Sequence, residues 1–179
     1  MPRVTKWVVA VLLVVAVAAR PAGGQIVAGD RSVSLNGMYL TLTGVPDATF
    51  SMGIGQLGFN KFQTSKFAWR VSALVQVSDV GDGAETMTGI GGGLEWNFNS
   101  EGKTTIPFIA TDVNLFSASG ESYTMLSPSA GFRSFLSRST SFDLAASYNM
   151  IVAGPEDTSG GLMMLRMGLS YYLGKDPRR

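Results

Sequence analysis

The sequence predicts an all-β fold: an eight-stranded antiparallel up-and-down transmembrane β-barrel, preceded by an N-terminal signal peptide. Three observations predict this fold for the 179 residues, which are enough for one domain. Hydrophobic residues make up 45% of the chain and charged residues only 15%, which is lean for a soluble protein. Apolar and polar residues alternate with period two in segments of about ten residues. Aromatic residues gather at one end of those segments.

The first residues have the pattern of a secretory signal peptide. Arg3 and Lys6 form a basic start, and the apolar stretch 7–19 is followed by small residues. Cleavage after Gly24 and cleavage after Ala18 both fit. An uncleaved membrane anchor is the alternative, but a spanning helix needs about 20 apolar residues. The chain is therefore expected to divide into a signal peptide, a barrel and a short polar tail: 1–24, 25–174 and 175–179.

Eight segments of the remaining chain alternate as strands do. In the clearest segment, Leu165, Met167 and Leu169 share one face, while Arg166 and Gly168 lie on the other. The connections are short and rich in turn-forming residues, so all neighbours can pair as antiparallel hairpins. The predicted strands are 32–43, 48–59, 66–77, 87–98, 105–116, 122–134, 139–151 and 162–173.

The polar faces of these segments distinguish a membrane barrel from a soluble one. Alternating strands also fit a soluble barrel of the lipocalin type or a β-sandwich, which bury their apolar faces. Here the polar faces are rich in Gly, Ala and Ser, and small residues fit the tight interior of an eight-stranded barrel. We therefore expect the apolar faces to point outward to lipid.

Aromatic residues gather at the strand ends that become periplasmic if the mature N-terminus is periplasmic. Such a belt is expected at a membrane–water interface, whereas ordinary core aromatics would not cluster at one level. The predicted interface aromatics are Phe67, Trp69, Trp96, Phe98, Phe132, Tyr171 and Tyr172.

Charged residues in the connections divide in the same way. The predicted outer loops carry only acids, and the predicted inner turns carry mainly bases. The outer acids are Asp47, Asp79, Asp82, Glu85, Glu121, Glu156 and Asp157. The inner charges are Lys61, Lys66, Lys103 and Arg138, with Glu101.

With these features the sequence resembles the small outer-membrane β-barrel proteins of the OmpA/OmpX-like class. The resemblance covers 32–173 through the strand pattern and stretches such as 126–133, together with the signal peptide. It implies a bacterial outer-membrane location, with outer-membrane lipid and the assembly machinery as partners. Two departures stand out: a polar tail, 174–179, follows the last aromatic residues, and Pro128 lies inside a strand. Because Pro cannot donate to the ladder, we expect a bulge or a strand end there.

Six charges face the predicted lumen and balance three against three. Arg70 and Glu95 are equidistant from the centre of the 78–87 loop, and Arg133 and Asp143 from the turn near 138. Residues equidistant from a hairpin turn lie opposite each other. Arg166 and Asp112 would form a second layer nearer the outside. We therefore expect a network that fills the lumen, made of Arg70, Glu95, Asp112, Arg133, Asp143 and Arg166.

Glycines on the two strands beside Arg70 would give it room in the lumen, or would relieve curvature in a small barrel. The glycines concerned are Gly53, Gly55, Gly89, Gly91 and Gly93.

The composition excludes several function classes. With no His, a Ser-His-Asp site is absent, and with no Cys there is neither a disulfide nor a thiolate metal site. Carboxylates matched to Arg make poor catalytic acids. We therefore expect no enzyme activity, no catalytic residue, no cofactor and no metal. The net charge of +1 and the absence of a basic cluster argue against nucleic-acid binding.

These observations favour a non-enzymatic barrel with a structural or surface-interaction role and a charge-plugged lumen. A narrow pore or transporter for small molecules is one alternative, and a soluble periplasmic lipocalin-like carrier is another. We expect a monomer.

Overall fold

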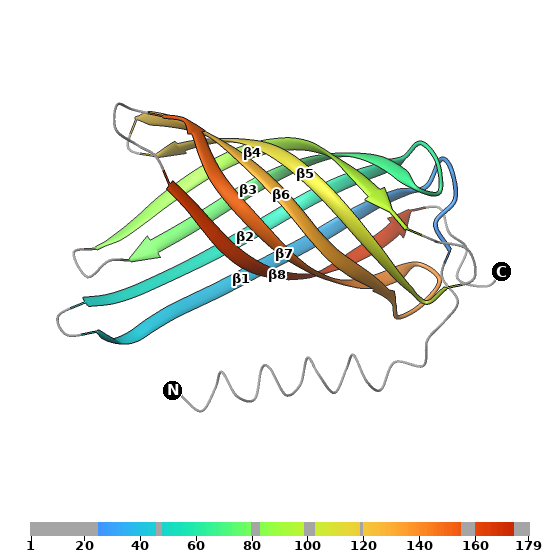
Figure 1. Cartoon of the computed structure of the whole chain (residues 1–179), viewed down its shortest axis with the longest axis horizontal. Helices are drawn as coiled ribbons and strands as arrows, with labels where there is room; N and C mark the ends of the chain where they lie inside the picture. The colour runs from blue at the N-terminus through green and yellow to red at the C-terminus, as the bar shows by residue number, and fades with distance from the viewer. Residues whose placement is uncertain are drawn as a thin grey trace.

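Among the residues that the computed structural model describes, strands make up the regular structure, and they close into one barrel (Figure 1). The predicted signal peptide and polar tail lie outside the residues that the structure describes. The described residues are 25–45, 48–79, 83–98, 103–118, 120–154 and 160–173.

Each predicted segment corresponds to one strand, with ends that differ by a few residues. The strands are β1 (Arg31–Val45), β2 (Ala48–Phe62), β3 (Phe67–Asp79), β4 (Ala84–Asn97), β5 (Thr105–Ala118), β6 (Glu121–Phe135), β7 (Thr140–Ala153) and β8 (Gly160–Leu173).

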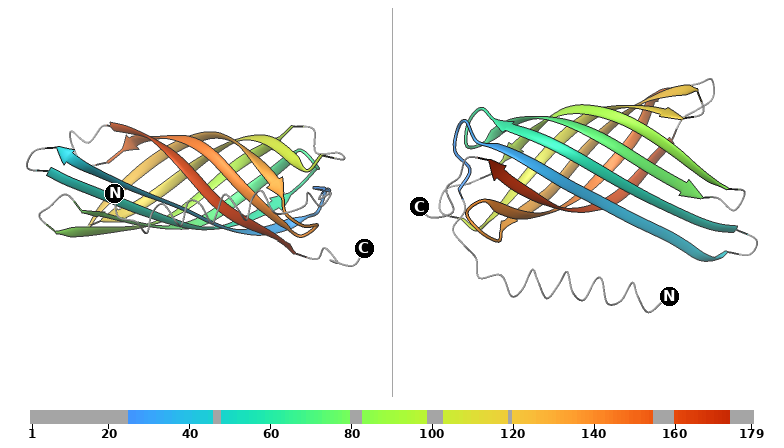
Figure 2. Two further views of the ribbon diagram at one scale, coloured as in Figure 1. Left: turned by 90° about the horizontal axis from the view of Figure 1, so that it is seen from below. Right: turned by 180° about the vertical axis from the view of Figure 1, so that it is seen from behind.

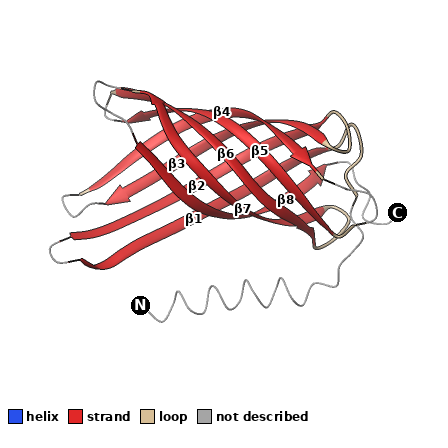
Figure 3. Ribbon diagram, in the orientation of Figure 1, coloured by secondary structure: helices blue, strands red, loops and turns tan. Residues whose placement is uncertain are grey.

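The strands follow one another around the barrel in chain order. Every neighbouring pair is antiparallel, and β8 pairs with β1 to close the sheet (Figure 3). The predicted fold class is confirmed. β1 begins and β8 ends at the same end of the barrel, which we call the inner end; the opposite end is the outer end. Along the described residues, no helix is long and apolar enough to cross a membrane.

Apolar side chains point out of this barrel and polar ones point in. On β8, Leu165 and Leu169 are 54% and 51% exposed, whereas Ser170 is fully buried. On β1, Leu35 is 65% exposed beside the buried Ser34. A lipocalin-type barrel buries its apolar face, so this arrangement argues against the soluble carrier and fits a lipid-facing barrel.

Most of the predicted interface aromatics lie on the lipid-facing surface of the barrel, close to its inner end. Trp96, Phe98, Phe132 and Tyr171 are 43–51% exposed, and Phe67 and Trp69 are half-buried on the same face. Rings on adjacent strands pair there, as Phe67 does with Trp96 at 6.4 Å between centroids.

Tyr172 is an exception to the predicted belt. Its side chain is fully buried and points into the barrel, where it stacks on Phe62 and contacts Phe135. Successive side chains of a strand point to opposite faces, so Tyr171 and Tyr172 cannot both face lipid.

Pro128 neither ends a strand nor sits in a bulge, contrary to the sequence-based expectation. It pairs with Thr111 of β5 without a register shift. On its other side, the β6–β7 pairing passes from Leu126 directly to Ser129 in the same register. The strand therefore tolerates the missing N–H group by omitting pairs on the β7 side. The shift of register in β6 lies between Thr124 and Met125.

The seam between β1 and β8 is paired only in its inner half. The register runs from Arg31 opposite Leu173 to Gly37 opposite Met167. Among the described residues, β1 after Gly37 and β8 before Met167 form no pairs with each other. The two strands diverge toward the outer end in Figures 1 and 2.

The residues before β1 fold under the inner end of the barrel. Val27 N donates to the Asp30 side chain at 3.0 Å, and Gly29 N donates to the Phe62 carbonyl at 2.8 Å. This turn brings Ile26 inside, where it is fully buried.

Candidate functional site in the lumen

Arg133 lies at the centre of the lumen and is 2% exposed. Its Nε donates to Asp143 Oδ1 at 2.9 Å and its Nη2 to Asp143 Oδ2 at 3.1 Å. Its Nη1 donates to Glu95 Oε1 at 2.8 Å, and its Nη2 lies 3.3 Å from Glu95 Oε2. One guanidinium therefore joins β4, β6 and β7 through two carboxylates in forked geometry. We call Glu95, Arg133 and Asp143 the central cluster.

Neighbouring polar side chains complete the central cluster. Ser141 and Ser170 hydroxyls donate to Asp143 at 2.9 and 2.7 Å. Asn97 Nδ2 donates to Glu95 Oε1 at 2.9 Å. Both carboxylates are thus hydrogen-bonded by side chains in addition to Arg133, which is what stabilises buried ions.

The register of Arg133 and Asp143 is the one that the turn spacing predicts: they lie opposite each other across β6 and β7. The register predicted for Arg70 and Glu95 is wrong. Arg70 lies opposite Gly93, and Glu95 lies opposite Ala68. β3 ends at Asp79 and β4 begins at Ala84, so the hairpin centre falls earlier than expected.

Arg70 joins the central cluster more loosely than Arg133 does. Its Nη1 lies 3.6 Å from Glu95 Oε2, and its Nε lies 3.7 Å from Asp112 Oδ1. Gly91 and Gly93 face the lumen beside it, where a Cβ would collide with Asn114 or Asp112.

The predicted glycine room is only partly correct. Gly53 and Gly55 of β2 pair with Val77 and Val75, whose side chains are exposed, so they lie on the outward face. They leave no space inside the lumen for Arg70.

The predicted second layer requires Arg166 to pair with Asp112, but the two residues do not pair. Within the described residues, no carboxylate oxygen lies within 4 Å of the Arg166 guanidinium. Its Nη1 donates to Gln56 Oε1 of β2 at 3.1 Å, and its Nε has no hydrogen-bond partner. Asp112 is buried and contacts Arg70 instead.

Apolar side chains lie against the central cluster on the side of the inner end. Phe62 and Phe108 place their rings 5.9 and 5.2 Å from the Arg133 guanidinium carbon, a cation–π distance. Farther toward the inner end lies a buried group that we call the apolar cap: Ile26, Phe62, Ala68, Ile106, Phe135 and Tyr172.

Little free volume remains at the level of the charges. A cavity of about 20 Å³ lies between Arg70, Arg133 and Arg166, bounded also by Ser34 and Asn36. That volume is close to the minimum that holds one water molecule.

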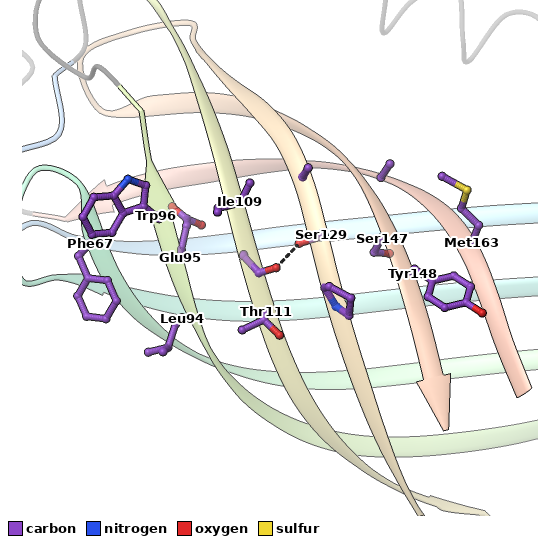
Figure 4. Close-up of a pocket in the computed structure, with 14 residues that line it drawn as sticks. Phe67, Leu94, Glu95, Trp96, Ile109, Thr111, Ser129, Ser147, Tyr148 and Met163 are labelled. Atoms are coloured by element: carbon purple, nitrogen blue, oxygen red, sulfur yellow. Dashed lines mark hydrogen bonds between the residues drawn. The ribbon is translucent and has the colours of Figure 1, made fainter. Parts of the chain in front are cut away.

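The outer face carries a larger hollow of about 620 Å³ across β4 to β8 (Figure 4). Its lining includes the small side chains of Thr111, Pro128 and Ala130 and the larger ones of Trp96 and Tyr148. Its lining is apolar and belongs to the lipid-facing surface. Among the described residues, no group of three or more Asp or Glu could hold a metal ion.

Sequence reasoning missed the partners that connect non-neighbouring strands. Counting from a turn places residues across one hairpin, but Glu95 and Arg133 lie on β4 and β6, with β5 between them. It also missed Ile26, and it did not place Phe62 in the lumen. Alternation was a usable signal for Phe62, since it shares the inward face of β2 with Asn60.

Solved structures similar to this one include a barrel domain from Pseudomonas aeruginosa and a Neisserial surface protein. The N-terminal β-barrel domain of Pseudomonas aeruginosa OprF aligns with a TM-score of 0.53 and 14% sequence identity, over 82% of this chain and 98% of that chain. Neisserial surface protein A, NspA, aligns with a TM-score of 0.56 and 10% identity, over 79% and 94%. Neither a protein-family model nor a curated protein sequence matches the chain.

At these identities the likeness shows the fold alone. That fold is the small outer-membrane β-barrel, as the sequence pattern predicted. The expected location in the bacterial outer membrane is supported by this fold together with the apolar outer face.

Proposed function

We propose that this protein is a non-enzymatic barrel of the bacterial outer membrane, with a structural or surface-interaction role and a lumen closed to solutes. The observation that carries the proposal is Arg133, which is bound by Glu95 and Asp143 across the centre of the lumen. Eight strands enclose an interior just wide enough for side chains, whereas water-filled porins have 16 or more.

A second barrier supports the closed lumen. The apolar cap lies between the central cluster and the inner end, and its members are almost completely buried. A hydrated ion would have to pass the charges and then lose its water in order to enter an apolar layer, which is unfavourable.

The surface role is supported by the charges at the two ends. Asp79, Glu85 and Glu121 lie at the outer ends of their strands, and the acids predicted at 47, 82, 156 and 157 lie outside the described residues. The described residues at the inner end include the predicted bases Lys61, Lys66, Lys103 and Arg138; Glu101, also predicted there, is not described. An acidic outer end fits contact with cationic groups at the cell surface.

We place outer-membrane lipid around the apolar face and expect the barrel to work as a monomer. We also retain the outer-membrane assembly machinery as the partner that inserts it.

Conductance tests the proposal directly. The folded protein, reconstituted in planar lipid bilayers, is expected to give no steady conductance above that of the lipid. A steady channel in most insertions would overturn the closed lumen and favour the narrow-pore alternative. A porin inserted in the same apparatus serves as the positive control.

A further inference from the structure

The hollow of about 620 Å³ on the lipid-facing surface lies over a run of small side chains on neighbouring strands. Thr111 of β5 lies opposite Pro128 of β6, and Ala130 of β6 lies opposite Ala146 of β7. Ligand pockets have volumes of about 300–1,000 Å³, so the hollow is large enough to hold one acyl chain. Larger side chains lie at its two ends, with Phe67, Leu94 and Trp96 at one and Tyr148 and Met163 at the other (Figure 4).

Main-chain atoms of β6 and β7 form part of the lining. Ser129 and Ser147 line the hollow, although both are buried residues of the lumen. Successive side chains of a strand point to opposite faces, so these two serines reach the lipid-facing surface with their main chain. The hydrogen bonds of this main chain are important, because hydrocarbon offers no donor or acceptor to a polar group.

One main-chain carbonyl in this lining lacks its ladder donor. The pairing of β6 with β7 omits Ser127 and Pro128 and is continuous again from Ser129. These omissions are expected where the missing N–H of Pro128 would have bonded to β7. Because Ser129 lies opposite Ser147, Pro128 lies opposite Tyr148. The Tyr148 carbonyl is therefore an acceptor that receives no N–H from β6.

A second hollow on the lipid-facing surface does not have this feature. Its volume is about 480 Å³, and it lies around Ala73 of β3. The registers of β3 with β2 and with β4 are continuous, so the main chain there has its ladder partners. Of these two hollows, the one across β4 to β8 alone combines an apolar lining with an acceptor that needs a donor.

The level of this carbonyl indicates which part of a lipid lies beside it. Tyr148 is eight positions after Thr140, where β7 begins at the inner end. At about 3.3 Å per residue and a tilt near 40°, it lies roughly 20 Å up an apolar band about 25 Å tall. The first carbons of an outer-leaflet acyl chain, next to the head group, lie at that level, and the rest of the chain extends inward.

We propose that the hollow binds one acyl chain of an outer-leaflet lipid, and that this chain carries a hydroxyl group close to the head group. The hydroxyl donates to the Tyr148 carbonyl in place of the N–H that Pro128 lacks, and the chain lies over Ala130 and Ala146. A plain acyl chain fills the same space but leaves the carbonyl unpaired in hydrocarbon. The site lies outside the barrel, so it does not depend on whether the lumen is closed.

Native mass spectrometry of the folded protein with added lipid tests this proposal. The probes are two phosphatidylcholines that differ only in whether their tetradecanoyl chains carry a 3-hydroxyl group. We expect one retained hydroxylated lipid per barrel, bound roughly five- to fifty-fold more tightly than its plain counterpart, as for one hydrogen bond to a buried acceptor. Equal retention of the two lipids would overturn the proposal, and so would a dimer that retains neither.

Pro128→Ala separates the hydrogen bond from the shape of the hollow. Alanine restores the N–H that can bond to the Tyr148 carbonyl, and its side chain is also small. The two lipids should therefore bind to this variant with the same affinity. A preference for the hydroxylated lipid that persists in Pro128→Ala would show that the Tyr148 carbonyl is not its cause, and the proposal would fail.

Two leucine variants provide a matched pair for the position of the site. Ala130→Leu fills the hollow across β4 to β8 and should weaken the binding of both lipids at least several-fold. Ala73→Leu fills the second hollow and should leave their binding unchanged. Circular dichroism verifies that each variant is folded. Equal losses in the two leucine variants would mean that the lipids do not bind in the proposed hollow.

Discussion

At the residue scale, Arg133 explains how so small a barrel holds a charged interior. A guanidinium has five donors in a fixed plane. The donors of Arg133, which lies on β6, meet Glu95 and Asn97 of β4 and Asp143 of β7. Because all three ions are buried and hydrogen-bonded, each depends on the others. Removal of one leaves its partners charged in a medium that solvates them poorly.

Arg133→Ala is therefore expected to lower the free energy of unfolding by about 3–5 kcal/mol, the cost of breaking a buried ion pair on one side. Urea unfolding in detergent or lipid measures the change. Arg138→Ala, in the exposed turn of the same hairpin, is the control and should stay within about 0.5 kcal/mol. Equal unfolding midpoints for the two variants would mean that the cluster does not stabilise the fold.

At the element scale, the strands were predictable and their fine registration was not. Alternation locates each strand because apolar side chains face lipid at every second position, as in 162–173. The predicted register of Arg70 was wrong because the sequence of the connection between β3 and β4, with a glycine at both 81 and 83, does not mark the centre of the turn. The contact of Glu95 with Arg133 depends on barrel curvature, which a single hairpin does not encode.

Close approach of strands at glycine gives a prediction for β6. A Cβ on Gly131 would collide with the Leu144 carbonyl and with Ala145, and backbone atoms cannot move aside. Gly131→Ala should therefore cost about 1–3 kcal/mol, as overpacking does. At Gly55, nothing lies within 4 Å of the added methyl, so Gly55→Ala should be neutral or slightly stabilising. Thermal or urea unfolding separates them; the reverse order would contradict the packing described.

The segment before β1 acts as a seal in the apolar cap. Ile26 is fully buried there, while its neighbour Val27 is 47% exposed. Ile26→Ala should destabilise the protein by about 2–5 kcal/mol, whereas Val27→Ala should have little effect. Unfolding curves measured side by side provide the comparison. Similar small losses for both would show that the segment does not pack under the barrel.

At the scale of the whole molecule, the interior is built in layers from inner to outer end. The apolar cap comes first and the central cluster second, and farther toward the outer end β1 and β8 are no longer paired with each other. The sequence predicts that apolar side chains point out of the barrel and polar side chains point into it. It does not predict the layering, since the layering depends on which strands cross at each level.

Thiol accessibility in the lumen tests the closed interior most directly. The chain has no native Cys, so one introduced thiol reports alone. Ser34 is 3% exposed, lines the small cavity between the charges, and its hydroxyl has no hydrogen-bond partner, so Ser34→Cys removes no bond. In liposomes, Ser34→Cys should react with a charged, water-soluble thiol reagent at least about a hundred-fold more slowly than Arg138→Cys, and equally fast once unfolded. Equal rates in the folded protein would show that water fills the lumen and would contradict the account.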